Sequence, residues 1–524
     1  MKLRTIVKIA ITSSVVLLCS GFALYSFFRL SAAEGQKDFN LYELVPSTTS
    51  AVFVTDDVLE FVAEVDELTC SKNQQYLYVS KLFSYLKQSL YALSEDTPHG
   101  LSRQMNQMLI SFHEPDNERN QVLYCRLGNG DKELVNRFVR KYISSLYPPK
   151  TFIYKGEEII IYPMADGDFL ACYLTSDFMA LSFQKKLIEN VIDAYKSGKS
   201  LADDSTFTGI RAPKKSAAAA TIYTRMQGMM GWTEFDMKMK DDFIYFSGIT
   251  HDADTCFAFI NQLRQQQSVK GFPGEVLPST AFYFSRQGIT DWVSLLSYGN
   301  AQGQSVPART SEVQNRDKEF SRYLMENAGQ DLVACLFQRE DTLQDAAAVL
   351  SLSVADVTEA ERMLRALVNA APADEGRRNP RITFCYTVNK AYPIYRLPQT
   401  TLFEQLTSFA EPTLDVYAAF YGGRLLLAPD ADALAHYIRQ LDKGEVLNGA
   451  MVYQTGMDHL SDSYHFMLMA DFDHIFQQSE NHVRFVPDFF LRNADFFRHF
   501  TLFVQFACAD GMVYPNIVLK YKSE

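Results

Sequence analysis

The feature that most constrains the fold is an order of sequence segments that occurs twice. Pro46 stands before the β-rich run Ala51–Val54, and Pro278 stands before the similar run Ala281–Phe284. A proline at the start of a run of β-branched and aromatic residues is typical of a strand that begins there. Because the segments that follow also recur in the same order, the sequence predicts one folding unit that is used twice.

The two segments that match best are Asp168–Leu201 and Asp415–Leu447. Each reads as a strand, a short turn, a second strand and a helix, and the apolar positions of the two helices share one register. Both helices end near a glycine, Gly198 or Gly444, where a left-handed C-terminal cap is expected. Each half then closes on a candidate antiparallel pair: Glu234–Lys240 with Phe243–Ile249, and Leu502–Ala507 with Met512–Leu519.

These observations predict an α+β fold with an N-terminal single transmembrane helix followed by two tandem copies of an antiparallel-sheet-plus-helices module. At 524 residues the chain is also too long for one compact core. The predicted divisions are a cytoplasmic basic segment at 1–8, a transmembrane anchor at 9–30, a stalk at 31–40, a first module at 41–270 and a second module at 271–524.

The N-terminus predicts the compartment. Lys2, Arg4 and Lys8 precede an uncharged run, Ile9–Phe28. As a helix this run would span roughly 30 Å, the thickness of the hydrocarbon core of a bilayer. Because basic residues accumulate on the cytoplasmic side, we expect a single-pass protein of the inner (cytoplasmic) membrane. Its N-terminus would lie in the cytoplasm and its bulk in the periplasm or outside.

Two alternatives to an uncleaved anchor stay open. Ser31, Ala32 and Ala33 offer small residues at which a signal peptidase could cut. Cys19 would be the acceptor in a lipoprotein, although the large Leu18 stands before it, where a small residue is preferred.

Charge and motifs argue against several classes of function. The net charge of −12 argues against nucleic-acid binding, which needs a basic face. The sequence has no GxxxxGK loop and no GxGxxG after a strand, so neither a nucleotide nor a cofactor is predicted. The commonest hydrolase motifs, GxSxG and HExxH, are missing as well.

One region carries weak candidates for metal ligands. Asp471, Asp473 and His474 place two carboxylates beside an imidazole, and these groups suit divalent cations. Their spacing matches no closed metal site, so solvated or hydrogen-bonded positions are the alternative interpretation. Five histidines fall in this part of the chain: His459, His465, His474, His482 and His499.

Two other groups of side chains could carry chemistry. His113 and Glu114, at a predicted hairpin turn, have the composition of an acid–base pair, but polar residues are common in turns. The cysteines beyond the anchor form no CxxC motif, and burial as small hydrophobic residues is the favoured interpretation. One or two disulfides stay open in an oxidising compartment. These cysteines are Cys70, Cys125, Cys172, Cys256, Cys335, Cys385 and Cys508.

A cluster of phenylalanines lies near the C-terminus and is interrupted by basic residues. We interpret it as a hydrophobic cap on a sheet, and the alternative is a helix that docks a partner or faces the membrane. The phenylalanines are Phe485, Phe489, Phe490, Phe496, Phe497 and Phe500.

Two short segments carry a resemblance to a known family. They are Leu44-Val45-Pro46-Ser47-Thr48, before the first strand, and Gly198-Lys199-Ser200-Leu201-Ala202-Asp203, at the end of a strand–helix unit. With them the chain resembles the exported, membrane-anchored bacterial family of tandem α+β proteins of unknown function. The resemblance covers most of residues 41–250 and, more loosely, the second half. It implies the same anchored tandem fold and identifies no catalytic residue, because the family has no established activity.

We therefore expect a membrane-anchored extracytoplasmic protein of the cell envelope that acts as a non-enzymatic binding or scaffold module. The expected partners are the membrane, through the N-terminal helix, and another envelope protein, with neither nucleic acid nor nucleotide. Tandem copies would also create a cleft between them, which is a usual place for binding. The alternative is an envelope hydrolase with an unrecognised site in the region His459–His499.

Overall fold

The structure of the chain, a computed structural model, describes residues 39–72, 103–113, 119–128, 131–138, 147–164, 167–211, 218–225, 231–250, 258–293, 295, 311–339, 346–370, 380–388, 390–407, 415–478, 486 and 488–522. The predicted basic segment and anchor lie outside these residues, as does most of the predicted stalk. Among the described residues, no helix combines the length and the apolar character needed to cross a membrane.

In the part of the chain that the structure describes, twenty strands form one antiparallel sheet, and the two halves contribute their strands in the same order. From one outer edge inward, the first half contributes β4 (Lys150–Tyr154), β5 (Glu157–Pro163), β6 (Phe169–Leu174), β7 (Phe178–Ser182), β3 (Gln121–Arg126), β2 (Met108–Phe112), β1 (Ala51–Thr55), β8 (Ala220–Thr224), β9 (Thr233–Lys240) and β10 (Phe243–Thr250).

From the opposite edge inward, the second half contributes β15 (Ile382–Tyr386), β16 (Ala391–Pro398), β17 (Asp415–Tyr421), β18 (Arg424–Ala428), β14 (Ala346–Val354), β13 (Ala328–Gln338), β12 (Ala281–Gly288), β20 (Phe466–Asp471), β21 (Phe500–Ala509) and β22 (Met512–Tyr521). Each strand of the first half therefore has a counterpart at the same place in the second. A separate small sheet pairs β11 (Val269–Lys270) with β19 (Ser463–Tyr464).

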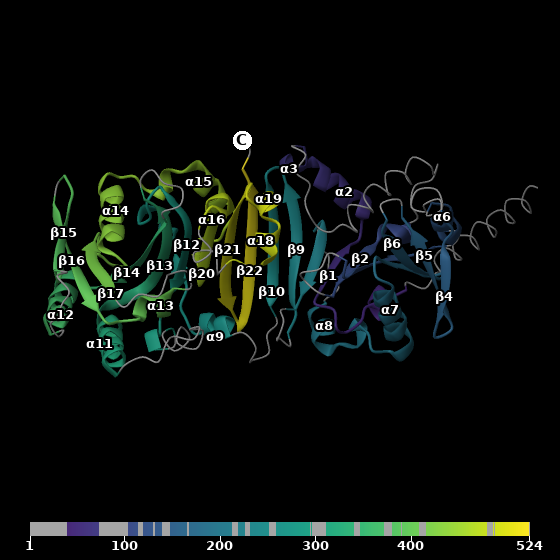
Figure 1. The fold of residues 1–524 in the computed structure, drawn as a ribbon, viewed down its shortest axis with the longest axis horizontal. Coiled ribbons are helices and arrows are strands. Elements are labelled where there is room, and N and C mark those ends of the chain that lie inside the picture. Colours follow the sequence, from purple (N-terminus) through teal and green to yellow (C-terminus); the bar gives the residue numbers. More distant parts are fainter. Residues whose placement is uncertain are drawn as a thin grey trace, which may run out of the picture.

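The strands β10 and β22 join the two halves of the sheet. Their register runs from Phe243 opposite Lys520 to Ser247 opposite Asn516, and both strands lie near the middle of the elongated molecule in Figure 1. The predicted α+β fold with two tandem antiparallel-sheet-plus-helices modules is therefore wrong, because one sheet runs through both. Each half ends on an open strand whose N–H and C=O groups need partners, and the two open strands satisfy each other. The predicted boundary between residues 270 and 271 stays a prediction.

Pro515 lies in this joint without breaking it. The N–H of Tyr521 donates to the carbonyl of Asp242 at 2.7 Å. By the alternation of antiparallel strands, every second N–H along β22, counted back from Tyr521, is therefore directed to β10. Pro515 falls in that series and has no N–H to donate. The ladder skips this point and resumes at Val513 opposite Thr250.

Helices pack against the sheet in both halves. In the first half they are η1 (Leu41–Leu44), α2 (Val58–Glu67), α3 (Thr69–Lys72), α5 (Arg103–Asn106), α6 (Asp131–Phe138), α7 (Lys185–Ser197), η3 (Leu201–Asp203), α8 (Ser205–Ile210) and α9 (Ala258–Arg264). In the second half they are η4 (Pro273–Glu275), α11 (Ser311–Asn327), α12 (Val357–Ala370), α13 (Leu402–Leu406), α14 (Ala431–Asp442), η5 (Leu447–Gly449), α15 (Met451–Met457), α16 (Phe472–Phe476), α18 (Asp488–Arg492) and α19 (Ala494–Phe497). In Figure 1, α7 runs along the lower side of its half and its counterpart α14 along the upper side of the other.

The helices α7 and α14 confirm the predicted helix pair. Both bury an apolar stripe against the sheet. α7 ends at Gly198, whose φ of 62° lies in the left-handed region that favours glycine. In each half a bridge then ties the opening proline to the segment after the helix: Pro46 lies opposite Ser200, and Pro278 lies opposite Val446.

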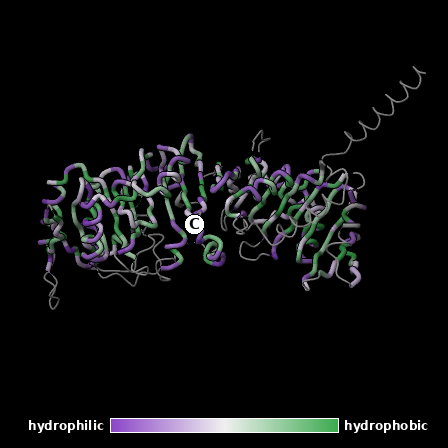
Figure 2. Tube along the Cα trace, turned by 90° about the horizontal axis from the view of Figure 1, so that it is seen from above, coloured by the Kyte–Doolittle hydropathy of each residue, from purple (hydrophilic) through white to green (hydrophobic). Residues whose placement is uncertain are grey.

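Three clusters of buried apolar side chains hold the helices to the sheet. One cluster contains residues of both halves, among them Phe53 and Ile110 from the first and Phe282 and Leu350 from the second. The other two lie under α7 and under α14. In Figure 2, hydrophobic and hydrophilic stretches alternate along the trace, as expected for strands with two different faces. The shared cluster is a second reason why the halves are not separate modules.

Candidate functional site

Two of the three predicted metal candidates lie close together. Asp471 caps the N-terminus of α16, and its carboxylate lies 3.3 Å from His474 Nδ1 and 2.7 Å from Lys522 Nζ. Asp473 instead accepts a hydrogen bond from Gln477. The Lys522 ammonium already pairs with the carboxylate that a cation would need. The described part of the chain holds no group of three His, Cys, Asp or Glu side chains placed to bind a metal ion.

Charge sets the protonation of this pair. The Asp471 carboxylate beside its Nδ1 raises the pKa of His474 above its usual value, although burial acts against this rise. Burial alone would raise the pKa of Asp471, but His474 and Lys522 hold it below its usual range. The two side chains therefore form an ion pair when the imidazole is protonated.

The other described histidines of this region lie in different surroundings. His459 contacts the ring of Phe243, with 4.5 Å between ring centres. His465 Nδ1 accepts a hydrogen bond from the N–H of Cys508 at 3.1 Å. His482 lies outside the described residues. His499 lies beside Tyr521, with 6.4 Å between ring centres, so each described histidine of this region has different neighbours.

The predicted acid–base pair at His113 is described only in part, because Glu114 lies outside the described residues. His113 Nε2 lies 2.9 Å from the hydroxyl of Ser111, which lies 3.1 Å from the hydroxyl of Tyr124. Burial lowers the pKa of His113 to about 4, so the ring is neutral at neutral pH. This arrangement is a satisfied hydrogen-bond network within the sheet.

Five of the six described cysteines are buried, which confirms their interpretation as small hydrophobic residues. Burial raises the pKa of Cys125 and Cys172 to about 12, so both thiols stay protonated and unreactive at neutral pH. Cys508 is partly exposed, and Cys256 lies outside the described residues. The buried free thiols are Cys70, Cys125, Cys172, Cys335 and Cys385.

The C-terminal phenylalanines pack on the sheet. Phe472 of α16 stacks on Phe490 of α18, with 4.9 Å between ring centres, and Phe490 meets Phe497 of α19 at 4.8 Å. Phe472 and Phe497 are buried. For Phe490, Phe496, Phe497 and Phe500 the hydrophobic-cap interpretation is confirmed, whereas Phe485 and the side chain of Phe489 lie outside the description.

The first half contains a cavity of about 250 Å³ at one end of β1, β2 and β8. Five long polar side chains line it: Tyr42 from η1, Gln107 before β2, Arg126 at the end of β3, Arg211 after α8 and Tyr223 in β8. Its apolar walls include Leu41, Val54, Leu109 and Ala220.

Several charged side chains around this cavity act on Tyr42. The guanidinium of Arg211 lies over the Tyr42 ring, 4.1 Å from its centre, in a cation–π contact. Burial raises the pKa of Tyr42 to about 12, with Arg211 acting against the rise, so the phenol stays protonated and can donate a hydrogen bond. The carboxylate of Asp56, also in the lining, accepts a hydrogen bond from Gln107 Nε2 at 2.5 Å.

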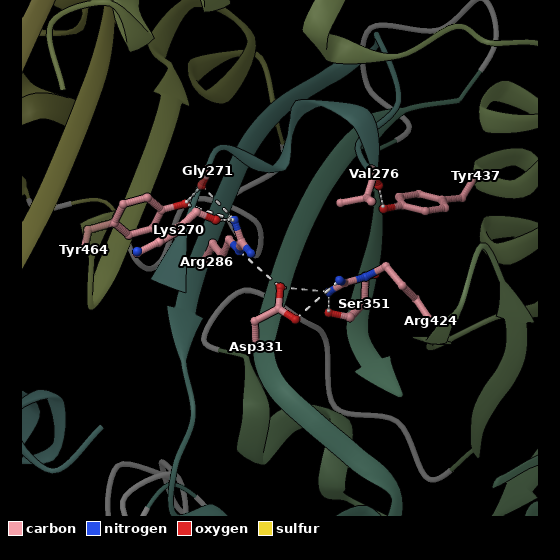
Figure 3. A network of polar contacts seen from close by, with 9 residues as sticks. All are labelled: Lys270, Gly271, Val276, Arg286, Asp331, Ser351, Arg424, Tyr437 and Tyr464. Atoms are coloured by element: carbon pink, nitrogen blue, oxygen red, sulfur yellow. Dashed lines mark hydrogen bonds and ion pairs between the residues drawn. The ribbon is translucent and has the colours of Figure 1, made fainter. Parts of the chain in front are cut away.

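The second half contains a buried ionic network, drawn in Figure 3. Asp331 lies between two guanidiniums: Arg286 Nε donates to it at 3.1 Å and Arg424 Nη2 at 3.2 Å. Arg424 also donates to the hydroxyl of Ser351 at 2.6 Å. Arg286 reaches the carbonyl of Gly271 at 2.9 Å. We call these side chains, together with Tyr464, the Asp331 network.

Tyr464 completes this network from the small second sheet. Its hydroxyl donates to the same Gly271 carbonyl at 2.8 Å, and its side chain is fully buried. Burial is also the main reason that the pKa of Tyr464 is raised, so the hydroxyl keeps its proton.

The ladder registers place the cavity and the Asp331 network at corresponding points of the two halves. Val54 pairs with Leu109 and Thr221, and its counterpart Arg286 pairs with Val333 and Met467. Both follow the opening proline of their half by the same number of residues. The same registers make Gln107 the counterpart of Asp331, and Ala218 the counterpart of Tyr464.

The residues of the cavity were not predicted from the sequence. Tyr42, Gln107, Arg126 and Arg211 come from separate elements, so no local motif joins them. The available signal was the contrast between the halves, where small or neutral residues in one stand against Arg, Asp and Tyr in the other. Neither protein-family models, nor curated proteins, nor solved structures give a match to this chain.

Proposed function

We propose that the protein is a membrane-anchored extracytoplasmic scaffold that docks another envelope protein and carries out no chemistry itself. The observation that supports this most directly is the joint between β10 and β22, which makes the two halves one elongated platform. A long sheet with a shared hydrophobic cluster keeps its two ends at a fixed separation, which suits a protein that holds partners apart or together.

The proposal includes the predicted placement of the chain. Residues 9–30 would anchor it in the inner membrane as a single pass, with the N-terminus in the cytoplasm. The two halves of the sheet would then face the periplasm or the outside, and the acidic balance of the chain is compatible with an aqueous envelope compartment. The resemblance to the exported tandem family likewise stays a proposal.

The outer edge strands are the surfaces that we propose for docking. Within the described residues, β4 pairs only with β5, and β15 pairs only with β16. β4 exposes Ile153 at 72%, and β15 exposes Phe384 at 54% and Tyr386 at 69%. An open strand with exposed apolar side chains can accept a further strand from a partner.

A second candidate function, the envelope hydrolase, is favoured by one observation. Asp471 lies beside His474 in the way that a carboxylate orients a general base. A hydrolase would be supported if the protein reacted with an electrophilic active-site probe and if His474→Gln abolished that labelling.

Photo-crosslinking of the full chain in its native cell tests the scaffold. A photoreactive amino acid would replace Tyr386, on the β15 edge, or Lys199, an exposed position away from both edges. We expect a discrete adduct with one envelope protein from position 386 and none from 199. The additional change Phe384→Lys should remove the adduct, since it places a charge on the docking strand. Equal labelling from both positions, or none, would count against a docking edge.

A further inference from the structure

We propose that the cavity beside Tyr42 is a binding site for a small organic anion, with the carboxylate or phosphate group of the ligand held by Arg126 and Arg211. The inference goes beyond the scaffold function and does not depend on it, because the cavity lies in the first half at the ends of β1, β2 and β8, away from the outer edges of the sheet.

The fold does not require this cavity. At the corresponding point of the second half, Arg286 and Tyr464 fill the space and Asp331 neutralises the guanidiniums. In the first half, Val54 and Ala218 are the counterparts of Arg286 and Tyr464, and these smaller side chains leave the space open. The same framework therefore packs this point with the protein's own side chains in one half and leaves it open in the other.

The volume of the cavity limits the size of the ligand. A cavity of about 250 Å³ is slightly smaller than the range of about 300–1,000 Å³ for pockets that bind drug-sized ligands. It would hold several water molecules or one compact organic molecule.

The guanidiniums of the lining favour an anionic ligand. The lining carries the guanidiniums of Arg126 and Arg211 and one carboxylate, that of Asp56. Glu234 acts on Tyr42 from outside the lining. Guanidinium groups bind carboxylate and phosphate with paired, charge-assisted hydrogen bonds, and the protonated Tyr42 hydroxyl adds a donor.

Apolar side chains of the lining would contact the rest of the ligand. Leu41, Val54, Leu109 and Ala220 add a smaller apolar part to a lining that is mostly polar. An anion with a compact hydrocarbon or aromatic body would contact this part and gain from the removal of apolar surface from water. A bare inorganic ion would leave these side chains wet.

Four probes that share one aromatic ring test the proposal on the full-length, detergent-solubilised protein. Benzoate and phenyl phosphate carry the proposed head groups, benzyl alcohol is neutral, and benzamidine is cationic. By titration calorimetry we expect at least one of the two anions to bind at least tenfold more tightly than benzyl alcohol and benzamidine. Preference between benzoate and phenyl phosphate then tells a carboxylate ligand from a phosphate ligand. Equal or tighter binding of benzamidine, or no binding of either anion at millimolar concentration, would overturn the proposal.

Variants locate the site. Arg126→Met and Arg211→Met should each weaken binding of the preferred anion roughly tenfold to a hundredfold, the effect of losing a charge-assisted hydrogen bond. Arg362→Met removes an exposed guanidinium of α12 and should leave the affinity unchanged. The double change Val54→Arg with Gln107→Asp copies the filled arrangement of the second half and should abolish binding. Unchanged affinity in both arginine variants would place the probe elsewhere and refute the assignment.

Discussion

At the scale of single residues, the Asp331 network shows how the sheet tolerates three buried charges. Burial alone would raise the pKa of Asp331, but Arg424 and Arg286 hold it below its usual range. The carboxylate therefore stays ionised and neutralises two guanidiniums that are themselves largely buried. Removing one member of such a network is costly because the remaining charges keep their desolvation penalty without their partner.

We predict that Asp331→Ala lowers the free energy of unfolding by about 3–5 kcal/mol at pH 7. Chemical unfolding followed by circular dichroism measures the loss. The folded pKa of Asp331 is depressed, so its contribution is present above the unfolded value of about 3.9 and is lost as the pH falls through the folded value. The difference between wild type and variant should therefore shrink in strong acid.

A matched replacement separates the charge from the packing. Changing Arg286, Asp331 and Arg424 together to Met, Leu and Met should recover most of the loss, because apolar side chains of similar volume can replace a buried ion network at little cost. A loss below about 1 kcal/mol for Asp331→Ala alone would mean that water reaches the two guanidiniums.

A second prediction concerns pH and His474. Its pKa is raised by the neighbouring Asp471 carboxylate, so the stability from this pair is present below the unfolded pKa of about 6.5 and is lost as the pH rises through the folded value. His474→Gln should therefore destabilise the protein more at pH 5.5 than at pH 8.5, as measured by unfolding at both values. A loss that is the same at both pH values would show that the imidazole contributes only by packing, as its stacking on Phe282 would allow.

Sequence reasoning at this scale works only where partners are near in the chain. Asp471 and His474 lie within one helical turn, and their closeness in the sequence predicts that they form a group. Arg286, Asp331 and Arg424 come from three strands, and their proximity depends on the ladder register that no local pattern reveals. The same reason explains why the residues around Tyr42 were missed.

At the scale of elements, the sequence is a good guide because local periodicity decides most strands and helices. The predicted pair Glu234–Lys240 and Phe243–Ile249 appears as β9 and β10, with bounds that differ by one residue at two ends. α7 ends at Gly198 as its apolar stripe and glycine predict. The pairing partner of an outer strand is harder to predict, because the alternation that predicts a strand does not say which strand lies beside it.

Two helical glycines give a prediction at this scale. A Cβ added at Gly456, in α15, would overlap the ring of Phe503 in β21, whereas a Cβ at Gly209, in α8, would meet no atom within 4 Å. Gly456→Ala should lower the free energy of unfolding by about 1–3 kcal/mol through overpacking. Gly209→Ala should raise it by about 0.5–1 kcal/mol, because alanine favours the helix.

Thermal unfolding of the two variants, side by side, checks this pair. The opposite signs are the informative result, since both changes are the same substitution in a short helix. A stabilising Gly456→Ala would mean that α15 can move away from Phe503 without loss of packing.

At the scale of the whole molecule, the repeated strand order carries the two halves to a joint that the sequence did not predict. Each half orders its strands in the same way and leaves one inner strand open, β10 or β22. The two open strands are far apart in the chain, so their pairing has no local signal. An open edge in each half is an aggregation hazard, and pairing them within one chain removes it. This explains why a duplicated order of elements produced one sheet instead of two modules.

A cross-linked variant tests the joint directly. Ser247 and Asn516 lie opposite each other across it, with the Ser247 hydroxyl 2.9 Å from Asn516 Oδ1. The Tyr521 N–H donates across the joint, and alternation then makes Ser247–Asn516 a non-hydrogen-bonded pair, in which Cα atoms are about 4.5 Å apart. That spacing suits a disulfide. We predict that Ser247→Cys with Asn516→Cys oxidises completely, which a shift in mobility on a non-reducing gel would report.

The oxidised form should also be more stable, because the bond closes a very long loop. The chain-entropy estimate for such a loop is about 5 kcal/mol, as an upper limit, and comparison of unfolding with and without reductant measures it. The matched control joins Ser247→Cys to Lys520→Cys, which lies opposite Phe243 and is out of register with Ser247. If the control oxidised as readily as the in-register pair, the two halves would be sliding or separating, and the platform proposed for docking would lose its basis. Oxidation confined to the in-register pair would instead establish that one continuous sheet fixes the distance between the β4 and β15 edges.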